Sequence, residues 1–229
     1  MPKAGPRYAI YFVPAASDPL YIFGASIIGY DCYTGRDVPF AGGLDAADWR
    51  PLVRAPRVYG FHATLKAPFQ LGESANEQQV CEALQRFASE RQRVAVGDLT
   101  VQALGTFIAL VPVSAAPALS DLAAAAVEAF DRFRAPLTDA DRKRRGDDFT
   151  ARQRQNLERW GYPYVFEDFR FHMTLTGSLG GADRERALPV LRHKFAMIAP
   201  ALEIDRIVVA RQADSNATFR VIAAAALTR

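Results

Sequence analysis

Two hydrophobic patterns divide the chain into predicted strands and predicted helices. Alternation with a period of two, combined with aromatic and β-branched residues, is typical of strands, and it occurs at 7–13, 94–104, 107–113, 204–211 and 218–227. Apolar residues at helical spacing predict helices over 20–28, 73–91, 117–133 and 183–198. Polar helical stretches are expected at 139–145 and 149–160, whereas 34–56, which is rich in Gly and Pro, is predicted to be a loop.

A five-residue frame occurs twice within two further predicted strands. The first copy is Phe61-His-Ala-Thr-Leu65, in a strand that we expect to end at Pro68, and the second is Phe171-His-Met-Thr-Leu175, in a strand over about 168–176. Because side chains alternate between the faces of a strand, His62, Thr64 and Lys66 are predicted to share one face of the first copy. Arg170, His172 and Thr174 share the corresponding face of the second. Two such faces brought together would form a site.

The order of predicted elements suggests an internal duplication. A helix, a frame-bearing strand, a helix and a strand pair follow one another twice along the chain. We therefore expect an α+β fold that is bilobal and internally duplicated, with two antiparallel sheets flanking a central cleft and helices on the outside. The whole of 1–229 would form a single bilobal domain with repeat halves of about 1–114 and 115–229, and strand exchange between the lobes stays open.

Composition narrows the classes of partner. The 229 residues are 50% hydrophobic and 23% charged, which is ordinary for a globular protein, and the net charge is +3. A mild positive charge suits a small anionic substrate, and an extended nucleic acid partner is not expected. No apolar run reaches the length of a membrane span, and the first residues lack the apolar core of a signal peptide. We therefore expect a cytoplasmic protein with no membrane association, whose oligomeric state the sequence leaves open.

The two histidines suit acid–base chemistry. Imidazole titrates near neutrality, so that one ring can accept a proton while the other donates one. The hydroxyls of Thr64 and Thr174 could donate hydrogen bonds to phosphate oxygens that gain charge in the transition state. Lys66 and Arg170 would add positive charge beside them. This set of groups favours phosphodiester cleavage over acyl transfer.

The sequence lacks the motifs of several other kinds of active site. It contains no Gly-x-Ser-x-Gly, no Gly-x-x-x-x-Gly-Lys-Ser/Thr and no Gly-x-Gly-x-x-Gly. The three histidines and two cysteines do not cluster at the spacing of metal ligands. We therefore predict a reaction that needs no metal and no cofactor.

The paired frames resemble the two His-x-Thr signatures of the 2H phosphoesterase superfamily. More narrowly, Arg7-Tyr-Ala-Ile-Tyr-Phe12, the segment around Gly29-Tyr-Asp31 and Gly60-Phe-His-Ala-Thr-Leu-Lys-Ala-Pro-Phe69 are similar to the DUF1045 branch, which is associated with phosphonate utilisation. The resemblance implies a bilobal fold with one frame-bearing strand in each lobe. It also implies catalysis by His62 and His172, with Thr64 and Thr174 holding phosphate oxygens.

The function that we predict from these observations is hydrolysis of a small cyclic phosphodiester, a 1,2- or 2′,3′-cyclic ribose phosphate, by two-histidine acid–base catalysis without a metal. The alternatives are a 2′-5′ RNA ligase or RNA end-processing enzyme, and a non-catalytic module that binds a phosphorylated metabolite. The near symmetry of the frames does not assign the acid and the base.

Several further residues have two interpretations. Tyr11 and Tyr30 could stack on a base or sugar, although core packing is favoured for both. The basic run at 142–145 is predicted to be solvated surface rather than a lid over the substrate.

Overall fold

A seven-stranded antiparallel sheet forms the centre of the protein. The computed structural model describes residues 5–139, 141–142 and 148–229. The sheet has the order β11-β10-β1-β4-β8-β7-β6. Its strands are β1 (Arg7–Phe12), β4 (Ala63–Gln70), β6 (Leu99–Leu104), β7 (Phe107–Pro112), β8 (Met173–Thr174), β10 (Arg206–Gln212) and β11 (Arg220–Ala226). Two small ribbons accompany it, β2 (Tyr30–Asp31) with β3 (Arg36–Asp37) and β5 (Val94–Gly97) with β9 (Leu202–Ile204).

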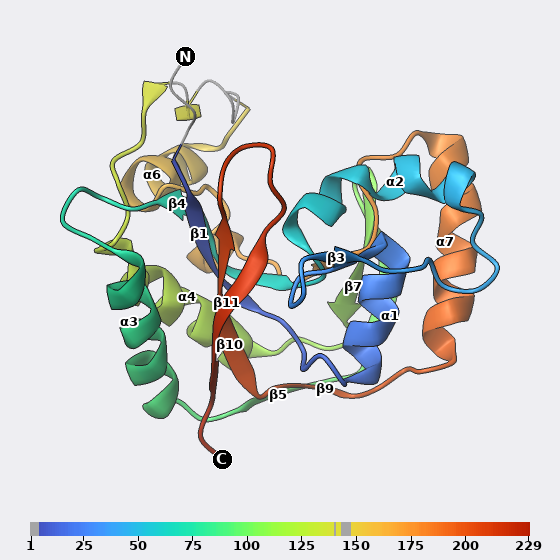
Figure 1. The fold of residues 1–229 in the computed structure, drawn as a ribbon, viewed down its shortest axis with the longest axis horizontal. Helices are drawn as coiled ribbons and strands as arrows, with labels where there is room; N and C mark the ends of the chain where they lie inside the picture. Colours follow the sequence, from blue (N-terminus) through green and yellow to red (C-terminus); the bar gives the residue numbers. More distant parts are fainter. Residues whose placement is uncertain (1–4, 140, 143–147) are drawn as a thin grey trace.

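The helices lie in two groups on either side of the sheet's central strands (Figure 1). One group contains α1 (Pro19–Ile28), α2 (Ala46–Tyr59) and α7 (Gly181–Ala196), and the other contains α3 (Glu77–Ser89), α4 (Pro117–Asp131) and α6 (Ala151–Trp160). Helix α3 packs against β10 and β11, α4 packs against β4, and α7 packs against β6 and β7. A 3₁₀ turn, η1 (Phe166–Asp168), precedes the second frame.

Side-chain caps explain where several helices begin. The carboxylate of Asp18 accepts a hydrogen bond from the backbone N–H of Leu20 at the start of α1. Asn76 and Thr150 each form a capping box, with Gln79 at the start of α3 and with Gln153 at the start of α6. Each cap satisfies backbone donors that the first helical turn leaves without partners. The four helices predicted from apolar spacing are present, with ends within a few residues of the predicted ones, although α4 and α7 begin without a side-chain cap.

The predicted loop at 34–56 is wrong over its second half, because α2 occupies Ala46–Tyr59. Asp45 begins this helix by accepting hydrogen bonds from the backbone N–H groups of Ala47 and Asp48. Trp49 and Val53, one helical turn apart, are buried. Pro51 and Pro56 lie inside the helix, and two prolines in a Gly-rich context normally indicate a loop. Burial of the apolar side of α2 outweighs that local preference.

The sheet differs from the predicted pair of sheets. The two frame-bearing strands, β4 and β8, pair with each other and join all seven strands into one antiparallel sheet. The strand order interleaves the predicted halves, because β1 and β4 are flanked by β10 and β8 from the second half. The second frame-bearing strand is much shorter than expected, with only Met173–Thr174 in β8. The expected strand at 94–104 is divided after Gly97, and its first part, β5, pairs with β9 instead.

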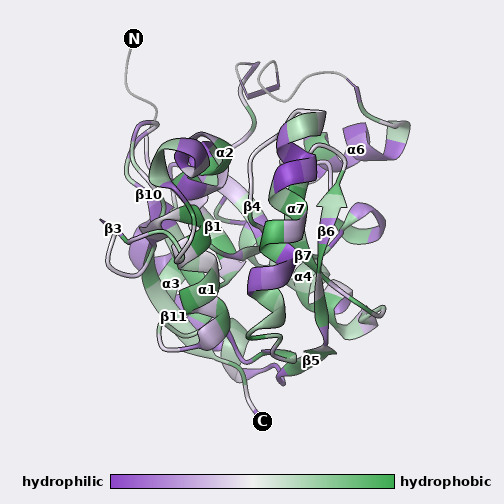
Figure 2. Cartoon of the chain, turned by 90° about the vertical axis from the view of Figure 1, so that its right-hand side faces the viewer, coloured by the Kyte–Doolittle hydropathy of each residue, from purple (hydrophilic) through white to green (hydrophobic). Residues whose placement is uncertain are grey.

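Apolar side chains are concentrated on the central strands, whereas exposed helix faces are hydrophilic (Figure 2). Tyr8 to Phe12 of β1 are all buried, which shows that this strand is covered on both faces. Behind the two frames, Phe61, Met173 and Leu175 are almost completely buried. Within the described ranges, no helix combines the length and the apolar character needed to cross a bilayer.

Candidate functional site

The two frames lie side by side in the middle of the sheet. Strands β4 and β8 are antiparallel, and Ala63 is paired with Met173. Continuing this register by one residue in each direction places His62 opposite Thr174 and Thr64 opposite His172. Residues directly opposite each other in an antiparallel pair have Cβ atoms about 4.5–5.5 Å apart. This register would bring each imidazole near the threonine of the other frame. All four side chains line two adjoining hollows.

His62 is held in a defined tautomer. Its Nδ1 lies 2.8 Å from the carbonyl oxygen of Gly60, to which only an N–H can donate, so Nε2 is the unprotonated nitrogen of the neutral ring. The Nε2 atom is 3.1 Å from Oγ1 of Thr64, whose hydroxyl can then donate to it. The ring also stacks on Tyr11, with centroids 3.8 Å apart. Burial lowers the pKa of His62 to about 4, the Gly60 carbonyl opposes this, and the nearby His172 adds to it.

His172 repeats the backbone contact but has a more open environment. Its Nδ1 lies 2.8 Å from the carbonyl oxygen of Arg170, two residues earlier, as in the first frame. The Phe107 ring is its aromatic neighbour, at 5.5 Å between centroids. Both histidines thus direct Nδ1 at the backbone and leave Nε2 for the site face. The repeat is symmetrical in sequence, but only His62 is stacked on a buried tyrosine.

Two hollows flank Thr64 on this face of the sheet. The first, of about 370 Å³, is lined by His62, Thr64 and Thr174 together with Tyr11, Arg7 and Tyr162. The second, of about 430 Å³, extends from Thr64 past His172 and is lined largely by aromatic and apolar side chains. Thr64 and Tyr162 contribute to both hollows. A small molecule bound across Thr64 would therefore contact both histidines.

Lys66 does not lie on the face predicted for it. The register between β1 and β4 shifts twice, so that Ile10 pairs with Lys66 but Tyr11 pairs with Thr64. Such a bulge inserts an extra residue and reverses the alternation beyond it. The ammonium of Lys66 instead donates to Asp131 at 3.0 Å and to the Val127 carbonyl at 3.1 Å, both in α4. Burial lowers the pKa of Lys66 to about 8, and the charge of Asp131 opposes that shift.

The other sequence-derived candidates divide between the site and the core. Tyr11 lines the first hollow and is also buried, so that it contributes to both. Tyr30 belongs to the core, because its hydroxyl donates to the carbonyl of Phe219 and accepts from Thr218. Arg170 lines the second hollow, where its guanidinium donates to the carbonyls of Glu167 and Phe169.

Three site residues were not identified from the sequence. Arg7 lies at the start of β1, Tyr59 ends α2, and Tyr162 lies in the segment after α6. All three line the first hollow. The alternation along β1 places Arg7 on the same face as Tyr11, which could have indicated it. Nothing in the sequence places Tyr59 or Tyr162 there.

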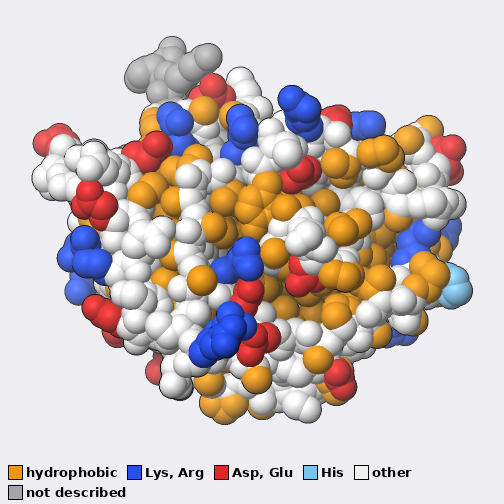
Figure 3. Space-filling view, turned by 60° about the horizontal axis from the view of Figure 1, so that its bottom comes forward, with side chains coloured by type: hydrophobic (Ala, Val, Ile, Leu, Met, Phe, Trp, Pro, Cys, Tyr) orange, Lys and Arg blue, Asp and Glu red, His pale blue; other side chains and the backbone are white. Residues whose placement is uncertain are grey.

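The charged surface shows no extended basic band on the face seen in Figure 3, where Lys and Arg side chains lie beside Asp and Glu. Of the basic run at 142–145, Arg142 pairs with Glu158 and Asp139, and the remaining positions lie outside the described residues. Across the described part of the chain, no group of three or more His, Cys, Asp or Glu side chains could hold a metal ion.

Comparison with known proteins gives a family and two curated relatives. The model of the family described as "Protein of unknown function (DUF1045)" matches residues 64–220, which include the second frame. A protein of Janthinobacterium sp. (strain Marseille) is 36% identical over 221 residues, covering 93% of this chain and 49% of the relative. A protein of Laribacter hongkongensis (strain HLHK9) is 40% identical over 179 residues, covering 77% of this chain and 41% of the relative. Both are named "Ribose 1,5-bisphosphate phosphokinase PhnN".

One solved structure has low similarity to this chain in both sequence and fold. "Crystal structure of phosphoesterase" shares 16% identity with a TM-score of 0.37, covering 97% of this chain and 99% of that chain. A TM-score of this size does not establish a common fold.

These names contradict the predicted function. Proteins that resemble this chain over most of its length are named as a kinase, whereas we predicted a hydrolase of cyclic phosphodiesters. The kinase name belongs to larger proteins, since the chain spans about half the length of the curated relatives that it matches. The names of the relatives describe an enzyme that acts on a ribose bisphosphate. They therefore contradict the prediction of a cyclic phosphodiesterase, which is wrong.

Proposed function

The chain belongs to the DUF1045 family, and we propose that it is an enzyme that binds a phosphorylated ribose across the two frames and transfers protons at one of its phosphate groups. The reaction class is phosphoryl transfer, in keeping with the name of the relatives. The PhnN designation in that name also supports the link with phosphonate utilisation that the resemblance to DUF1045 implied.

The observation that carries the proposal is the antiparallel pairing of the two frame-bearing strands, β4 and β8. Continuing the Ala63–Met173 register brings each histidine near the threonine of the other frame, and Nε2 of His62 also lies 3.1 Å from Oγ1 of Thr64 in its own frame. A tetrahedral phosphate between them can accept hydrogen bonds from two hydroxyls while each Nε2 approaches a different oxygen. Hydrogen bonds to charged oxygens are about twice as strong as neutral ones, so the hydroxyls would favour a phosphate group over a neutral one.

We infer different roles for the two histidines from their surroundings. His62 is neutral with Nε2 unprotonated, so that it accepts the proton of the attacking oxygen. His172 lies in the more open position, where its Nε2 can contact a second oxygen of the same phosphate. The P–O bond that breaks is in the phosphoryl donor, and the electrons of that bond leave with the donor's diphosphate. Proton transfer from positioned groups contributes about 10²–10⁴-fold to a rate.

Two features limit what this chain supplies by itself. Its sequence has no Gly-x-x-x-x-Gly-Lys-Ser/Thr segment of the kind that cradles a nucleotide triphosphate. In the relatives, roughly as much chain again lies outside the match. We therefore assign ribose phosphate binding and proton transfer to this chain, and binding of the phosphoryl donor to the part of the relatives outside the match.

We also propose that the chain belongs to the 2H phosphoesterase superfamily. The two frames, with a histidine and a threonine two residues apart on neighbouring strands, support this placement. The placement concerns the architecture of the site and leaves the reaction class as stated above.

The test combines binding with turnover. Ribose 1,5-bisphosphate and ribose 5-phosphate are titrated into the protein by calorimetry, and conversion of each in the presence of ATP and Mg²⁺ is followed by ³¹P NMR. The samples are the Janthinobacterium relative and its variants at the positions aligned with His62 and His172, alongside this chain with His62→Ala and His172→Ala. We expect either substitution to lower turnover by about 10²–10⁴-fold.

A matched control is available within the chain. His193 is exposed on α7, and in this chain His193→Ala is expected to bind ribose phosphates like the wild-type protein. Failure of the wild-type chain to bind any ribose phosphate would refute the proposal. Unchanged turnover in both frame variants would refute the assignment of the histidines.

A further inference from the structure

The first hollow extends well beyond the histidines. Along β1, Tyr11 is paired with Thr64, whereas Arg7 is paired with Gln70 at the other end of β4. Four residues of an extended strand span about 13 Å. Arg7 and Thr64 both line the same hollow of about 370 Å³. The hollow therefore reaches from the two frames to a cation that takes no part in the proton transfers described above.

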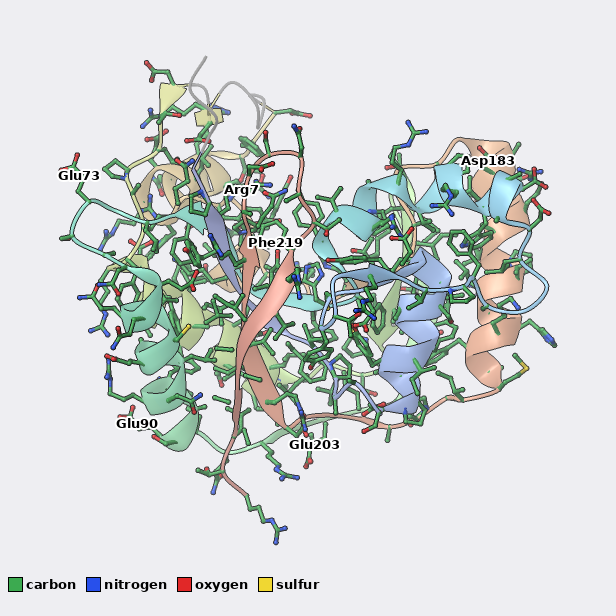
Figure 4. All side chains as sticks on the ribbon, in the orientation of Figure 1. Arg7, Glu73, Glu90, Asp183, Glu203 and Phe219 are labelled. Carbon is green, nitrogen blue, oxygen red and sulfur yellow. The ribbon has the colours of Figure 1, made fainter. Side chains whose placement is uncertain are left out.

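The guanidinium of Arg7 is held in place by buried neighbours. Its Nε donates to Oε1 of Gln212 at 2.7 Å, and Gln212 is fixed in turn by donating to the Ala217 carbonyl at 2.8 Å. Its Cζ lies 5.4 Å from the centroid of the Phe219 ring, and Figure 4 shows the two side chains near each other between β1 and β11. Gln212 and Phe219 are almost completely buried. A cation oriented in advance loses little side-chain entropy when it binds an anion.

Within the described residues, Arg7 forms its hydrogen bond through Nε to an uncharged amide oxygen, and no ion pair includes it. A guanidinium presents five N–H donors, so its terminal nitrogens keep donors for a ligand. In contrast, Arg206 and Arg211 of β10 are paired with carboxylates, Arg206 with Asp205 and Arg211 with Glu77.

A second, independent observation is the hydroxyl of Tyr11. This side chain is 1% exposed and lines the hollow. Its hydroxyl has no hydrogen-bond partner anywhere in the described chain. Burial raises the pKa of Tyr11 well above its ordinary value, the effect of Tyr59 adds to this, and the charge of Arg7 opposes it. The hydroxyl therefore carries its proton at neutral pH. A buried donor without an acceptor is costly, and an oxygen of a bound ligand would remove that cost.

We propose that Arg7 and Tyr11 form a second anion subsite in the first hollow, which holds a phosphate group of the substrate other than the one between the frames. The preferred ligand is consequently a ribose that carries two phosphates, one at the frames and one at Arg7. This inference rests on the proposed function, because it adds a second contact to the ligand assigned to the frames. Arginine matches the oxygens of a phosphate with two parallel N–H donors, and the tyrosine hydroxyl supplies a third.

The experiment compares affinities for ligands that differ by one phosphate. Calorimetric titrations with ribose 1,5-bisphosphate, ribose 5-phosphate and ribose 1-phosphate are carried out on wild type, Arg7→Gln and Tyr11→Phe. We expect wild type to bind the bisphosphate at least tenfold more tightly than either monophosphate. Loss of a hydrogen bond to a charged group lowers affinity by about ten- to a hundredfold. Arg7→Gln should therefore remove most of the preference for the bisphosphate, and Tyr11→Phe should reduce it.

Two control variants keep similar chemistry away from the hollow. Tyr8→Phe removes a hydroxyl from the same strand on its opposite face, where it donates to Glu77 at 3.0 Å. Arg93→Gln removes an arginine that pairs with Glu203 between β5 and β9. Both controls should retain the wild-type preference. Circular dichroism melts confirm that each variant is folded, and Arg7→Gln alone decides the outcome if Tyr11→Phe unfolds.

The outcomes separate this inference from the function on which it rests. Equal wild-type affinity for mono- and bisphosphates overturns the second subsite while leaving the first intact. A uniform loss of affinity for all three ligands in Arg7→Gln also overturns it, because the arginine would then act without regard to the second phosphate. Absence of binding to any ribose phosphate overturns the proposed function and the subsite together.

Discussion

The lowered pKa of His62 makes a quantitative prediction about stability. Removal from water and the neighbouring His172 lower this pKa to about 4, against an ordinary value of 6.5. Between these two values the unfolded chain binds the proton and the folded chain does not. Stability therefore rises with pH across this window, is fully present above about pH 6.5, and is lost as the pH falls towards 4. A difference of this size corresponds to about 3 kcal/mol.

The perturbation that isolates this effect is His62→Asn. An asparagine amide can still donate to the Gly60 carbonyl that accepts from Nδ1 of His62, but it has no proton to gain in this range. The variant should therefore lack the His62 contribution to the pH dependence. Stacking on Tyr11 is also lost, which lowers stability by a similar amount at every pH and leaves the slope unaffected.

The assay is urea unfolding of the wild type and the variant at intervals between pH 4 and 7.5. We expect the wild type to lose about 3 kcal/mol more than His62→Asn between pH 7 and pH 4. His193→Asn, which keeps His62, serves as the control and should retain the wild-type slope. The His62 ring protons should also titrate near pH 4 in an NMR experiment. Titration of His62 near 6.5, with parallel stability curves for wild type and variant, would refute the reasoning.

Three further substitutions test the packing around the frames. Gly24→Ala should lower unfolding stability by about 1–3 kcal/mol in urea, because the new Cβ would lie 2.1 Å from Cγ of the buried Phe61 ring; a gain in stability, as helix propensity alone predicts, would contradict this. Lys66→Met should leave calorimetric affinity for ribose phosphates within about threefold, since a lost contact to a ligand charge would cost about tenfold or more, and Lys66 contacts α4. Thr176→Val should cost about 1–3 kcal/mol, measured by thermal unfolding, because Thr176 accepts from the backbone N–H of Ile108.

The frames themselves could be predicted from the sequence for a local reason. Alternation in Phe61-His-Ala-Thr-Leu65 places His62 and Thr64 on one face whatever the strand pairs with. The apolar residues of each frame, Phe61 among them, are buried as the pattern indicates. The helices that were predicted correctly are also determined by nearby residues, because their apolar spacing and their caps lie within a few residues of each other.

Where prediction failed, a distant contact determined the local structure. The bulge that turns Lys66 towards Asp131 arises where β4 pairs with β1. No property of β4 alone indicates it. Helix α2 contains two prolines and is stabilised by the burial of Trp49 and Val53 against the rest of the fold. Tyr162 reaches the site from a segment with no regular pattern.

The sequence by itself determined which residues can do chemistry, namely the two histidines and two threonines in repeated frames. Side-chain alternation and hydrogen-bonding capacity are properties of a residue and its immediate neighbours. Only the tertiary structure decided the antiparallel pairing of the two frame-bearing strands, the neutral tautomer of His62, and the place of Arg7 and Tyr11 in the same hollow. These depend on strand register and on burial, which arise when segments far apart in the chain pack together.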